Sequence, residues 1–148
     1  MAKSQDKQQF PPQQQNPPGT EGAMRPDPRS EMQEYKGSGK LQGKVALVTG
    51  GDSGIGRAAA IGFAKEGADV AIVYLNEHED AETTRKYVEE AGRKAFLIDG
   101  DIGSEKFCRE VVGKVVGEFG RIDILVNNAA MQRPKESLEE ISEEQLTA

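Results

Sequence analysis

The sequence predicts an α/β fold in which helices cover both faces of a parallel β-sheet. From residue 41 onward, short apolar runs of strand length alternate with longer segments whose apolar residues recur at helical spacing. Glycines and other turn-forming residues separate these segments. Such an alternation is typical of parallel sheets joined by right-handed crossovers. We therefore expect a doubly wound, three-layer αβα domain with strand order 3-2-1-4.

The first strand and the first helix are predicted from the residues that open this domain. The run KVALVT (44–49) is apolar and rich in β-branched residues, which suits a strand buried on both faces. The segment 54–67 is predicted as a helix that ends at Gly67. Its apolar residues at helical spacing are Ile55, Ala58, Ala59 and Phe63.

The middle of the chain continues the pattern. DVAIVYL (69–75) is predicted as a second buried strand because it is again apolar and β-branched. The segment 79–92 is amphipathic at helical spacing and is predicted as a helix that Gly92 ends. KAFLID (94–99) is predicted as the third strand.

The last elements follow from residue 104. Residues 104–120 are predicted as a helix with Ser104 as its N-cap. One face of this helix is expected to carry Phe107, Val111, Val112, Val115 and Phe119. The fourth strand is predicted over 122–130, where it runs into a polar turn. A further helix is expected to start within 137–148, with Ser142 as a candidate cap.

Residues 1–40 differ in composition from the rest of the chain. They are dominated by Gln, Pro, Gly and charged residues, and two Pro-Pro pairs favour an extended polyproline conformation. These residues include few large apolar groups, and burying so few cannot offset the conformational entropy that the chain would lose on ordering. We therefore predict a disordered tail here. A single domain is expected over 41–148.

Composition also limits the partners. The net charge of −6 disfavours nucleic acid, because phosphate binding needs a concentrated basic surface. The sequence has no run of about twenty apolar residues that would span a membrane, and its amino terminus lacks an apolar signal-peptide core. Cys108 is the only cysteine, which excludes an intrachain disulfide and fits a reducing compartment. We expect a cytoplasmic protein with neither nucleic-acid nor membrane partners.

A cluster of glycines, TGGDSGIG (49–56), follows the first predicted strand. In a doubly wound sheet this turn faces the crevice at the carboxyl ends of the strands, where ligands bind. Gly50 allows a tight exit from the strand, Gly54 lets backbone N–H groups approach a phosphate, and Gly56 lets the helix pack closely. The helix N-terminus adds its own N–H groups and the positive end of its dipole. The loop predicts a diphosphate site; glycines that serve only a tight turn are the alternative.

The spacing T-G-x-x-x-G-x-G over 49–56 and the segment NNAA (127–130) after the fourth predicted strand resemble the short-chain dehydrogenase/reductase family. The resemblance covers 41–148 and implies the first half of a Rossmann-type fold that binds NAD(P). The Pro- and Gln-rich leader and GGDSGIGR are most similar to bacterial general-stress and glucose/ribitol dehydrogenase-like members. Ala130 stands where the family commonly has glycine.

The resemblance implies that the loops after the strands hold a nicotinamide dinucleotide. Asp101 and Ile102 would hold the adenine ring, with a turn-capping role for Asp101 as the alternative. The segment 128–130 would line the ribose and the nicotinamide, whereas Asn127 is expected to tie neighbouring strands together. The residues predicted to bind the coenzyme are Gly50, Asp52, Ser53, Gly54, Ile55, Gly56, Tyr74, Leu75, Asn76, Asp101, Ile102, Asn128, Ala129 and Ala130.

The choice between NADP and NAD depends on the end of the second strand. An NAD enzyme usually carries an acid there, which binds the ribose 2′-hydroxyl and repels a 2′-phosphate. Tyr74 takes this position, so no acid excludes NADP. Ser53 and Leu75 stand where NADP-preferring relatives often have a base. We expect NADP or the use of both coenzymes, and for Arg57 either a phosphate contact or an exposed position on its helix.

The resemblance also implies catalysis by a serine and a Tyr-x-x-x-Lys pair, in which the tyrosine is the general acid–base. Neither Tyr35, Tyr74 nor Tyr87 has a lysine four residues further on. The sole histidine, His78, lies among carboxylates at the start of a predicted helix and makes a poor metal site. We predict no catalytic residue and no metal site in this chain.

The fourth strand, apolar on both faces and unpaired at the edge of the sheet, would be an aggregation hazard. We therefore expect the amino-terminal part of a longer oxidoreductase, which would transfer hydride between NAD(P) and an alcohol, sugar or carbonyl substrate. Homo-oligomers are expected only for the full-length form. The alternative is a short protein that binds a dinucleotide or a partner chain without catalysis.

Overall fold

A computed structural model describes residues 23–26, 28–130, 137–140 and 142. The tail predicted for the first residues therefore lies largely outside the described residues. The same holds for most of the helix predicted near the carboxyl end. The described part of that helix is a short 3₁₀ helix, η2 (Leu138–Glu140).

The core of the fold is a four-stranded sheet. Its strands are β1 (Val45–Thr49), β2 (Asp69–Tyr74), β3 (Ala95–Asp99) and β4 (Ile124–Asn127). All neighbours pair in parallel, and the order is β3-β2-β1-β4, which confirms the predicted 3-2-1-4 arrangement. The last residue of β1 lies between Val73 of β2 and Asn127 of β4. The loops that follow these strands therefore meet at one edge of the sheet.

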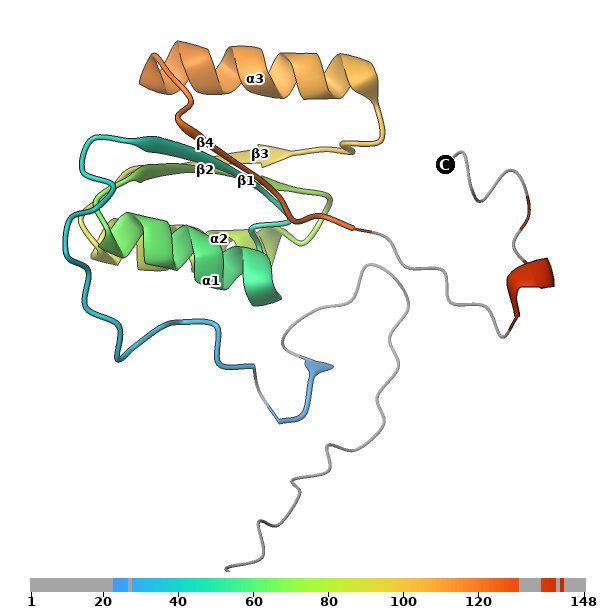
Figure 1. The fold of residues 1–148 in the computed structure, drawn as a ribbon, viewed down its shortest axis with the longest axis horizontal. Helices are drawn as coiled ribbons and strands as arrows, with labels where there is room; N and C mark the ends of the chain where they lie inside the picture. Colours follow the sequence, from blue (N-terminus) through green and yellow to red (C-terminus); the bar gives the residue numbers. More distant parts are fainter. Residues whose placement is uncertain (1–22, 27, 131–136, 141, 143–148) are drawn as a thin grey trace, which may run out of the picture.

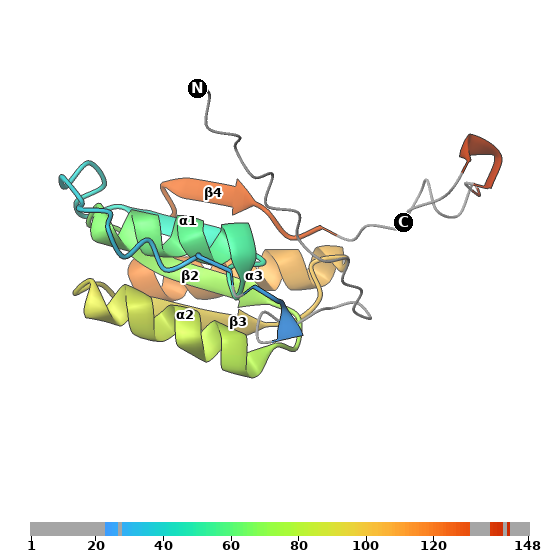
Figure 2. The same ribbon diagram turned by 90° about the horizontal axis from the view of Figure 1, so that it is seen from below.

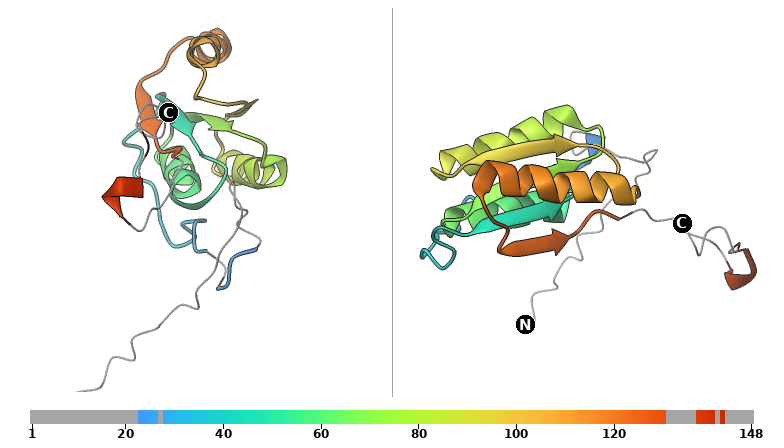
Figure 3. Two further views of the ribbon diagram at one scale, coloured as in Figure 1. Left: turned by 90° about the vertical axis from the view of Figure 1, so that its right-hand side faces the viewer. Right: turned by 90° about the horizontal axis from the view of Figure 1, so that it is seen from above.

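Three α-helices complete the three layers. They are α1 (Gly54–Lys65), α2 (His78–Glu90) and α3 (Glu105–Phe119). Figure 1 shows α1 and α2 on one face of the sheet and α3 on the other, and the end-on view in Figure 3 separates the layers. This division follows from right-handed crossovers, since β1 to β3 progress in one direction across the sheet and β4 lies in the other.

Each face of the sheet has its own apolar core. On the α3 side, the buried residues are Val45, Leu47, Ala71, Val73, Ile98, Val111 and Val115. On the α1–α2 side, they are Val48, Ala60, Ala64, Val70, Ile72 and Val88. Alternate residues of β1 and β2 thus enter opposite cores, so both strands are buried on both faces and must be apolar throughout.

Two predicted helix faces need correction. In α1, the predicted Ile55 is 82% exposed, and the residues that the helix buries are Gly56, Arg57, Ala60, Ile61 and Ala64. In α3, Val112 is 49% exposed because it lies one residue beyond the stripe formed by Val111 and Val115. The predicted cap is confirmed, since the Ser104 hydroxyl accepts a hydrogen bond from the Phe107 N–H (3.3 Å).

The residues just before the predicted domain boundary contact the domain. Residues 30–41, called here the N-terminal strap, run along α1 (Figure 2). Glu66, at the end of α1, accepts hydrogen bonds from the Ser38 and Lys40 N–H groups (3.0 and 2.9 Å) and from the Tyr35 hydroxyl. The boundary at residue 41 stays a prediction. The sequence does not indicate the strap contacts, because they join polar groups to a distant helix end.

Candidate functional site

The predicted site residues lie in the four loops that follow β1, β2, β3 and β4. Because the sheet is parallel, these loops share its carboxyl edge. Figure 3 shows the strands pointing toward this edge. The topology thus brings together residues that are up to 80 positions apart, such as Thr49 and Ala129, whose N–H donates to the threonine hydroxyl (3.1 Å).

The glycine loop folds tightly onto the start of α1. Gly50 has a φ of +62°, a conformation that favours glycine. A Cβ on Gly56 would lie 1.9 Å from the Gly50 carbonyl oxygen and 2.6 Å from Asn128 Nδ2. Gly56 is therefore needed so that the helix can pack against the loop itself, in addition to the predicted packing against the sheet.

The mouth of the loop is open at its third glycine. Gly54 has a φ of +52°, and an added Cβ there would meet nothing within 4 Å. Gly54 opens α1, whose first turn holds no acidic residue and whose N-cap, Ser53, makes no side-chain capping bond. The positive end of the helix dipole therefore lies at an exposed residue, an arrangement that suits an anionic oxygen.

Arg57 is not exposed on its helix. It is only 5% exposed, and its guanidinium donates to the Asp52 carbonyl oxygen from Nε (2.9 Å) and Nη2 (2.6 Å). Nη2 also donates to Asp80 Oδ1 of α2 (3.2 Å). The expected exposed position was therefore wrong, because α2 supplies partners from outside the motif, whereas the phosphate contact stays a prediction.

Asp52 lies inside the loop and is buried. Burial raises the pKa of its carboxyl group, while its own backbone N–H and the Ser53 hydroxyl act in the opposite direction. The charges of Glu77 and Asp80 raise this pKa further. The Asp52 carboxylate is thus close enough to Glu77 and Asp80 to be affected by their charges.

Three predicted residues surround the end of β2. The Tyr74 side chain is buried, and its hydroxyl lies 2.9 Å from His78 Nδ1. The two rings meet edge to face, with centroids 5.4 Å apart. Leu75 is 44% exposed, and Asn76 follows it in the loop before α2. Sequence analysis missed the pairing of Tyr74 with His78, although their spacing of four residues was a usable signal.

Asp101 forms a turn after β3. Its Oδ1 accepts a hydrogen bond from the Gly103 N–H (2.8 Å), and its carbonyl oxygen accepts one from the Ser104 N–H (3.2 Å). The structure thus contains the turn role that was the alternative for this residue. Binding of adenine by Asp101 and Ile102 stays a prediction.

The side chain that ties β4 to β1 is Asn128. Its Nδ2 donates to the carbonyl oxygens of Thr49 (3.1 Å) and Gly50 (2.9 Å), and its backbone N–H donates to the Thr49 hydroxyl (3.0 Å). The assignment of this role to Asn127 was therefore wrong by one residue. Asn128 fixes the loop that holds Ala129 and Ala130, both exposed at the same edge.

Three exposed apolar side chains rim this edge. Ile55, Leu75 and Ile102 are 82%, 44% and 37% exposed, and they come from the loops or helix starts after β1, β2 and β3. Large apolar groups that remain in contact with water at one edge often mark a binding surface. The sequence identified each of these residues, but only the strand order shows that they lie along one line.

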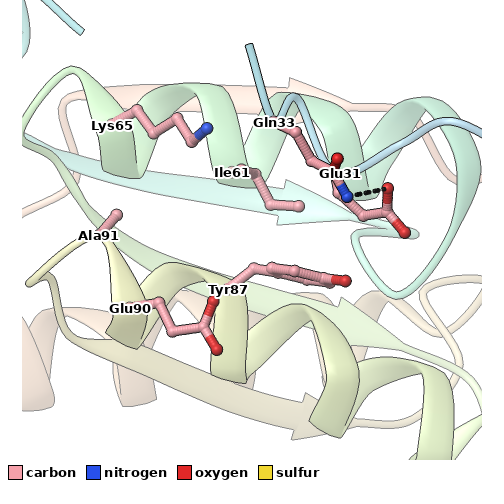
Figure 4. A pocket seen from close by; sticks show the side chains of 7 residues that line it. All are labelled: Glu31, Gln33, Ile61, Lys65, Tyr87, Glu90 and Ala91. Atoms are coloured by element: carbon pink, nitrogen blue, oxygen red, sulfur yellow. Dashed lines mark hydrogen bonds between the residues drawn. The ribbon is translucent and has the colours of Figure 1, made fainter. Parts of the chain in front are cut away.

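A separate hollow of about 330 Å³ lies on the outer face of the helix layer. Figure 4 shows Ile61, Tyr87 and Ala91 between α1 and α2, with Glu31 and Gln33 of the N-terminal strap above them. Gln33 Nε2 donates to Glu31 Oε2 (3.3 Å). This hollow is on the far side of α1 from the central sheet and contains none of the predicted site residues.

Within the described part of the chain, no cluster of three or more His, Cys, Asp or Glu side chains could hold a metal ion. No helix among those residues is long and apolar enough to cross a lipid bilayer.

Comparison with known proteins decides the family. The profile for short chain dehydrogenases matches residues 44–148. The chain belongs to the short-chain dehydrogenase family. Its relatives in this family include general stress protein 39 of Bacillus subtilis (strain 168), which is 60% identical over 133 residues, or 90% of this chain and 46% of that protein.

Two further members of the short-chain dehydrogenase family are informative. The glucose and ribitol dehydrogenase of Daucus carota is 48% identical over 145 residues, which are 93% of this chain and 50% of that protein. A short chain dehydrogenase from Burkholderia cenocepacia J2315, solved in complex with NADP, is 42% identical with a TM-score of 0.64. That match covers 72% of this chain and 43% of the solved one. This chain therefore spans about half the length of the relatives it matches.

Proposed function

We propose that this chain is the coenzyme-binding part of an NAD(P)-dependent oxidoreductase. The observation that carries the proposal is the glycine loop at the start of α1, where Gly54 is exposed and an added Cβ would meet nothing within 4 Å at the carboxyl edge of the sheet. Phosphate groups bind at such helix starts through backbone N–H groups and the helix dipole. When bound, the nicotinamide of the coenzyme would accept or donate hydride.

Each loop has a part of the coenzyme assigned to it. The amides from Ser53 to Gly56 would bind the diphosphate. The apolar rim of Ile102 and Leu75, together with the Asp101 carboxylate, would hold the adenine ring. The segment 128–130, fixed to β1 by its asparagine, would line the nicotinamide half.

The relatives support this proposal and the substrate class. The Burkholderia structure was solved with NADP, and the Daucus relative is a glucose and ribitol dehydrogenase. For this chain we propose NADP or NAD as coenzyme. An alcohol, sugar or carbonyl compound would be the substrate of the whole enzyme.

The chain's own tyrosines support binding without turnover. The hydroxyl of Tyr35 donates to Glu66, and that of Tyr74 pairs with His78. A tyrosine that acts as general acid–base needs a nearby cation to lower its pKa, yet burial raises the pKa of Tyr74 and Tyr87. We therefore propose that catalysis requires residues of a longer protein, and that this chain alone shows no dehydrogenase turnover.

Calorimetric titration of the chain with NADPH and NADH tests the proposal. Gly54→Ala should weaken binding at least tenfold, because its Cβ would occupy the open mouth and its φ of +52° disfavours alanine. Gly92→Ala is a matched control, since Gly92 has a φ of +76° and equally open space but lies at the far end of α2. Absence of heat with both coenzymes, or equal affinities of the two variants, would contradict the proposal.

Turnover separates this proposal from a non-catalytic dinucleotide-binding protein. Both predict that the purified chain binds coenzyme without oxidising alcohols or sugars. Only the proposal of an oxidoreductase predicts that turnover appears when the sequence is part of a longer chain of the same length as its relatives.

A further inference from the structure

One carbonyl oxygen in the glycine loop accepts several hydrogen bonds. The Asp52 carbonyl oxygen accepts hydrogen bonds from Arg57 Nε (2.9 Å), Arg57 Nη2 (2.6 Å) and the Thr84 hydroxyl (2.9 Å). Arg57 is 5% exposed and Thr84 is fully buried. This carbonyl group is therefore held in one direction, because any rotation of its peptide would break hydrogen bonds with two buried side chains at once.

The fixed carbonyl group sets the direction of the next amide. The peptide between Asp52 and Ser53 is trans, and a planar trans peptide points its C=O and N–H groups in opposite directions. With the carbonyl directed inward at Arg57, the Ser53 N–H is directed away from it. Ser53 is the N-cap of α1 and directly precedes Gly54, where an added Cβ would meet nothing within 4 Å, so this amide belongs to the exposed start of the helix.

The hydrogen bonds of Arg57 also link the loop to α2. Arg57 Nη2 donates to Asp80 Oδ1 (3.2 Å), and Nε donates to the Thr84 hydroxyl (2.9 Å). A buried cation is costly unless its partners satisfy it. Asp80 and Thr84 of α2 both bond to the arginine, so the second helix of the fold is coupled to the geometry of the first loop.

We propose that Arg57 and Thr84 are positioning residues for diphosphate recognition. They orient the Ser53 amide toward an oxygen atom of the bound diphosphate. This inference rests on the proposed function, since it concerns the same loop. Neither side chain touches the coenzyme; both act through the Asp52–Ser53 peptide.

Three variants test the inference. Arg57→Met removes all guanidinium donors and keeps the aliphatic stem, whereas Arg57→Lys keeps the charge without the fork. Thr84→Val removes one hydroxyl at nearly constant shape, so it stays informative if Arg57→Met fails to fold. Arg93→Met is the control, because Arg93 also forms a close ion pair, with Asp69 (2.8 Å), but at the opposite edge of the sheet.

Two measurements distinguish an effect of these residues on coenzyme binding from an effect on the stability of the fold. The dissociation constant of NADPH or NADH should rise about tenfold for Arg57→Met and severalfold for Thr84→Val, the loss expected for one misaligned hydrogen bond to a charged group. It should stay within twofold for Arg93→Met, even though that variant melts earlier. In amide NMR spectra, titration with ADP should shift the Ser53 signal in the unsubstituted chain and in Arg93→Met, but not in Arg57→Met.

The outcomes are distinct. Unchanged affinity and an unchanged Ser53 response in folded Arg57→Met and Thr84→Val would overturn this inference and leave the proposed function standing. A chain that binds neither coenzyme nor ADP without substitution would overturn both. Recovery of part of the affinity by Arg57→Lys would support an effect of donor geometry in addition to charge.

Discussion

Gly56 and Gly54 lie two residues apart but meet different surroundings. The missing side chain of Gly56 lets α1 start directly against the Gly50 carbonyl oxygen, which would lie 1.9 Å from an added Cβ. At Gly54 an added Cβ would meet nothing within 4 Å. The glycines of this motif therefore have different causes, since one is required by internal packing and the other by access.

Gly56→Ala should destabilise the fold by at least about 2 kcal/mol, because the clash is with backbone atoms that cannot move aside. Gly117→Ala is the matched control, since Gly117 is exposed on α3 and an added Cβ meets nothing within 4 Å. That substitution should instead stabilise by about 0.5–1 kcal/mol through helix propensity. Urea unfolding of both variants measures the difference, and a similar sign for the two would contradict this account.

At the residue scale, sequence alone identified the glycine loop but misplaced its supports. The spacing of Gly50, Gly54 and Gly56 was enough to predict the loop, because the residues that determine its conformation lie within eight consecutive positions. Arg57 was misjudged because the groups that bury it, Asp80 and Thr84, lie on another helix. Asn128 was exchanged with its neighbour because the alternation of strand faces could not be counted without the register of β4 on β1.

At the scale of elements, the N-terminal strap and the end of α1 form one polar unit. The Glu66 carboxylate accepts hydrogen bonds from the Tyr35 hydroxyl and from two strap amides. The Tyr35 hydrogen bond, followed by the backbone hydrogen bond from Lys40, lowers the pKa of Glu66 from 4.5 to about 2. The strap is therefore attached to the domain through an ionised group.

This attachment predicts an acid-sensitive contribution to stability. A carboxyl group with a lowered pKa in the folded state stabilises fully above its ordinary value of 4.5, and the contribution is lost as the pH falls toward 2. Glu66→Gln should lower the melting temperature at pH 7, and the gap from the unsubstituted chain should close on acidification across this window. Melting curves between pH 7 and pH 2 check it.

The control for this pH series is Glu105→Gln. Glu105 pairs with Arg109 on the surface of α3, where both side chains are about 80% exposed, and such pairs contribute little. A gap for Glu66→Gln that stays constant with pH would show that the strap is held by its neutral contacts alone.

The regular elements were predicted well because their signals are local. Strand runs such as 44–49 and helix stops such as Gly92 depend on neighbouring residues only, and the observed bounds differ by a few residues at most. The segment 122–130 was predicted as a strand that runs into a polar turn, and β4 ends at Asn127, after which Asn128 bonds to β1. The strap was missed because its partner Glu66 is 31 residues from Tyr35, so no local pattern indicates the contact.

At the scale of the whole molecule, the two faces of the sheet are covered unequally. Two helices cover one face, and in the described residues only α3 covers the other (Figure 1). Leu125 of β4 lies on the α3 side beside Leu47, yet it is 58% exposed. Val112 and Val116 of α3 are 49% and 44% exposed. These three residues are called here the α3–β4 face.

The α3–β4 face adjoins an edge of the sheet. β4 is the last strand of the described sheet and pairs only with β1. Edge strands offer unpaired backbone groups to other chains, and exposed apolar patches add a driving force for association. The sequence led us to expect homo-oligomers only for the full-length form, but these exposed residues lead us to expect that copies of this chain also associate through this face as the concentration rises.

Light scattering coupled to size-exclusion chromatography tests this expectation with the double variant Val116→Lys/Leu125→Lys. Lysine at these positions should shift the chain toward the monomer, because charges on an edge strand and on its neighbouring helix oppose pairing. The fold should be unaffected, since both sites are exposed. Ile55→Lys is the control, because Ile55 is 82% exposed at the carboxyl edge and should change coenzyme binding without changing the mass distribution. If the double variant associates as strongly as the unsubstituted chain, another surface must be responsible for the association.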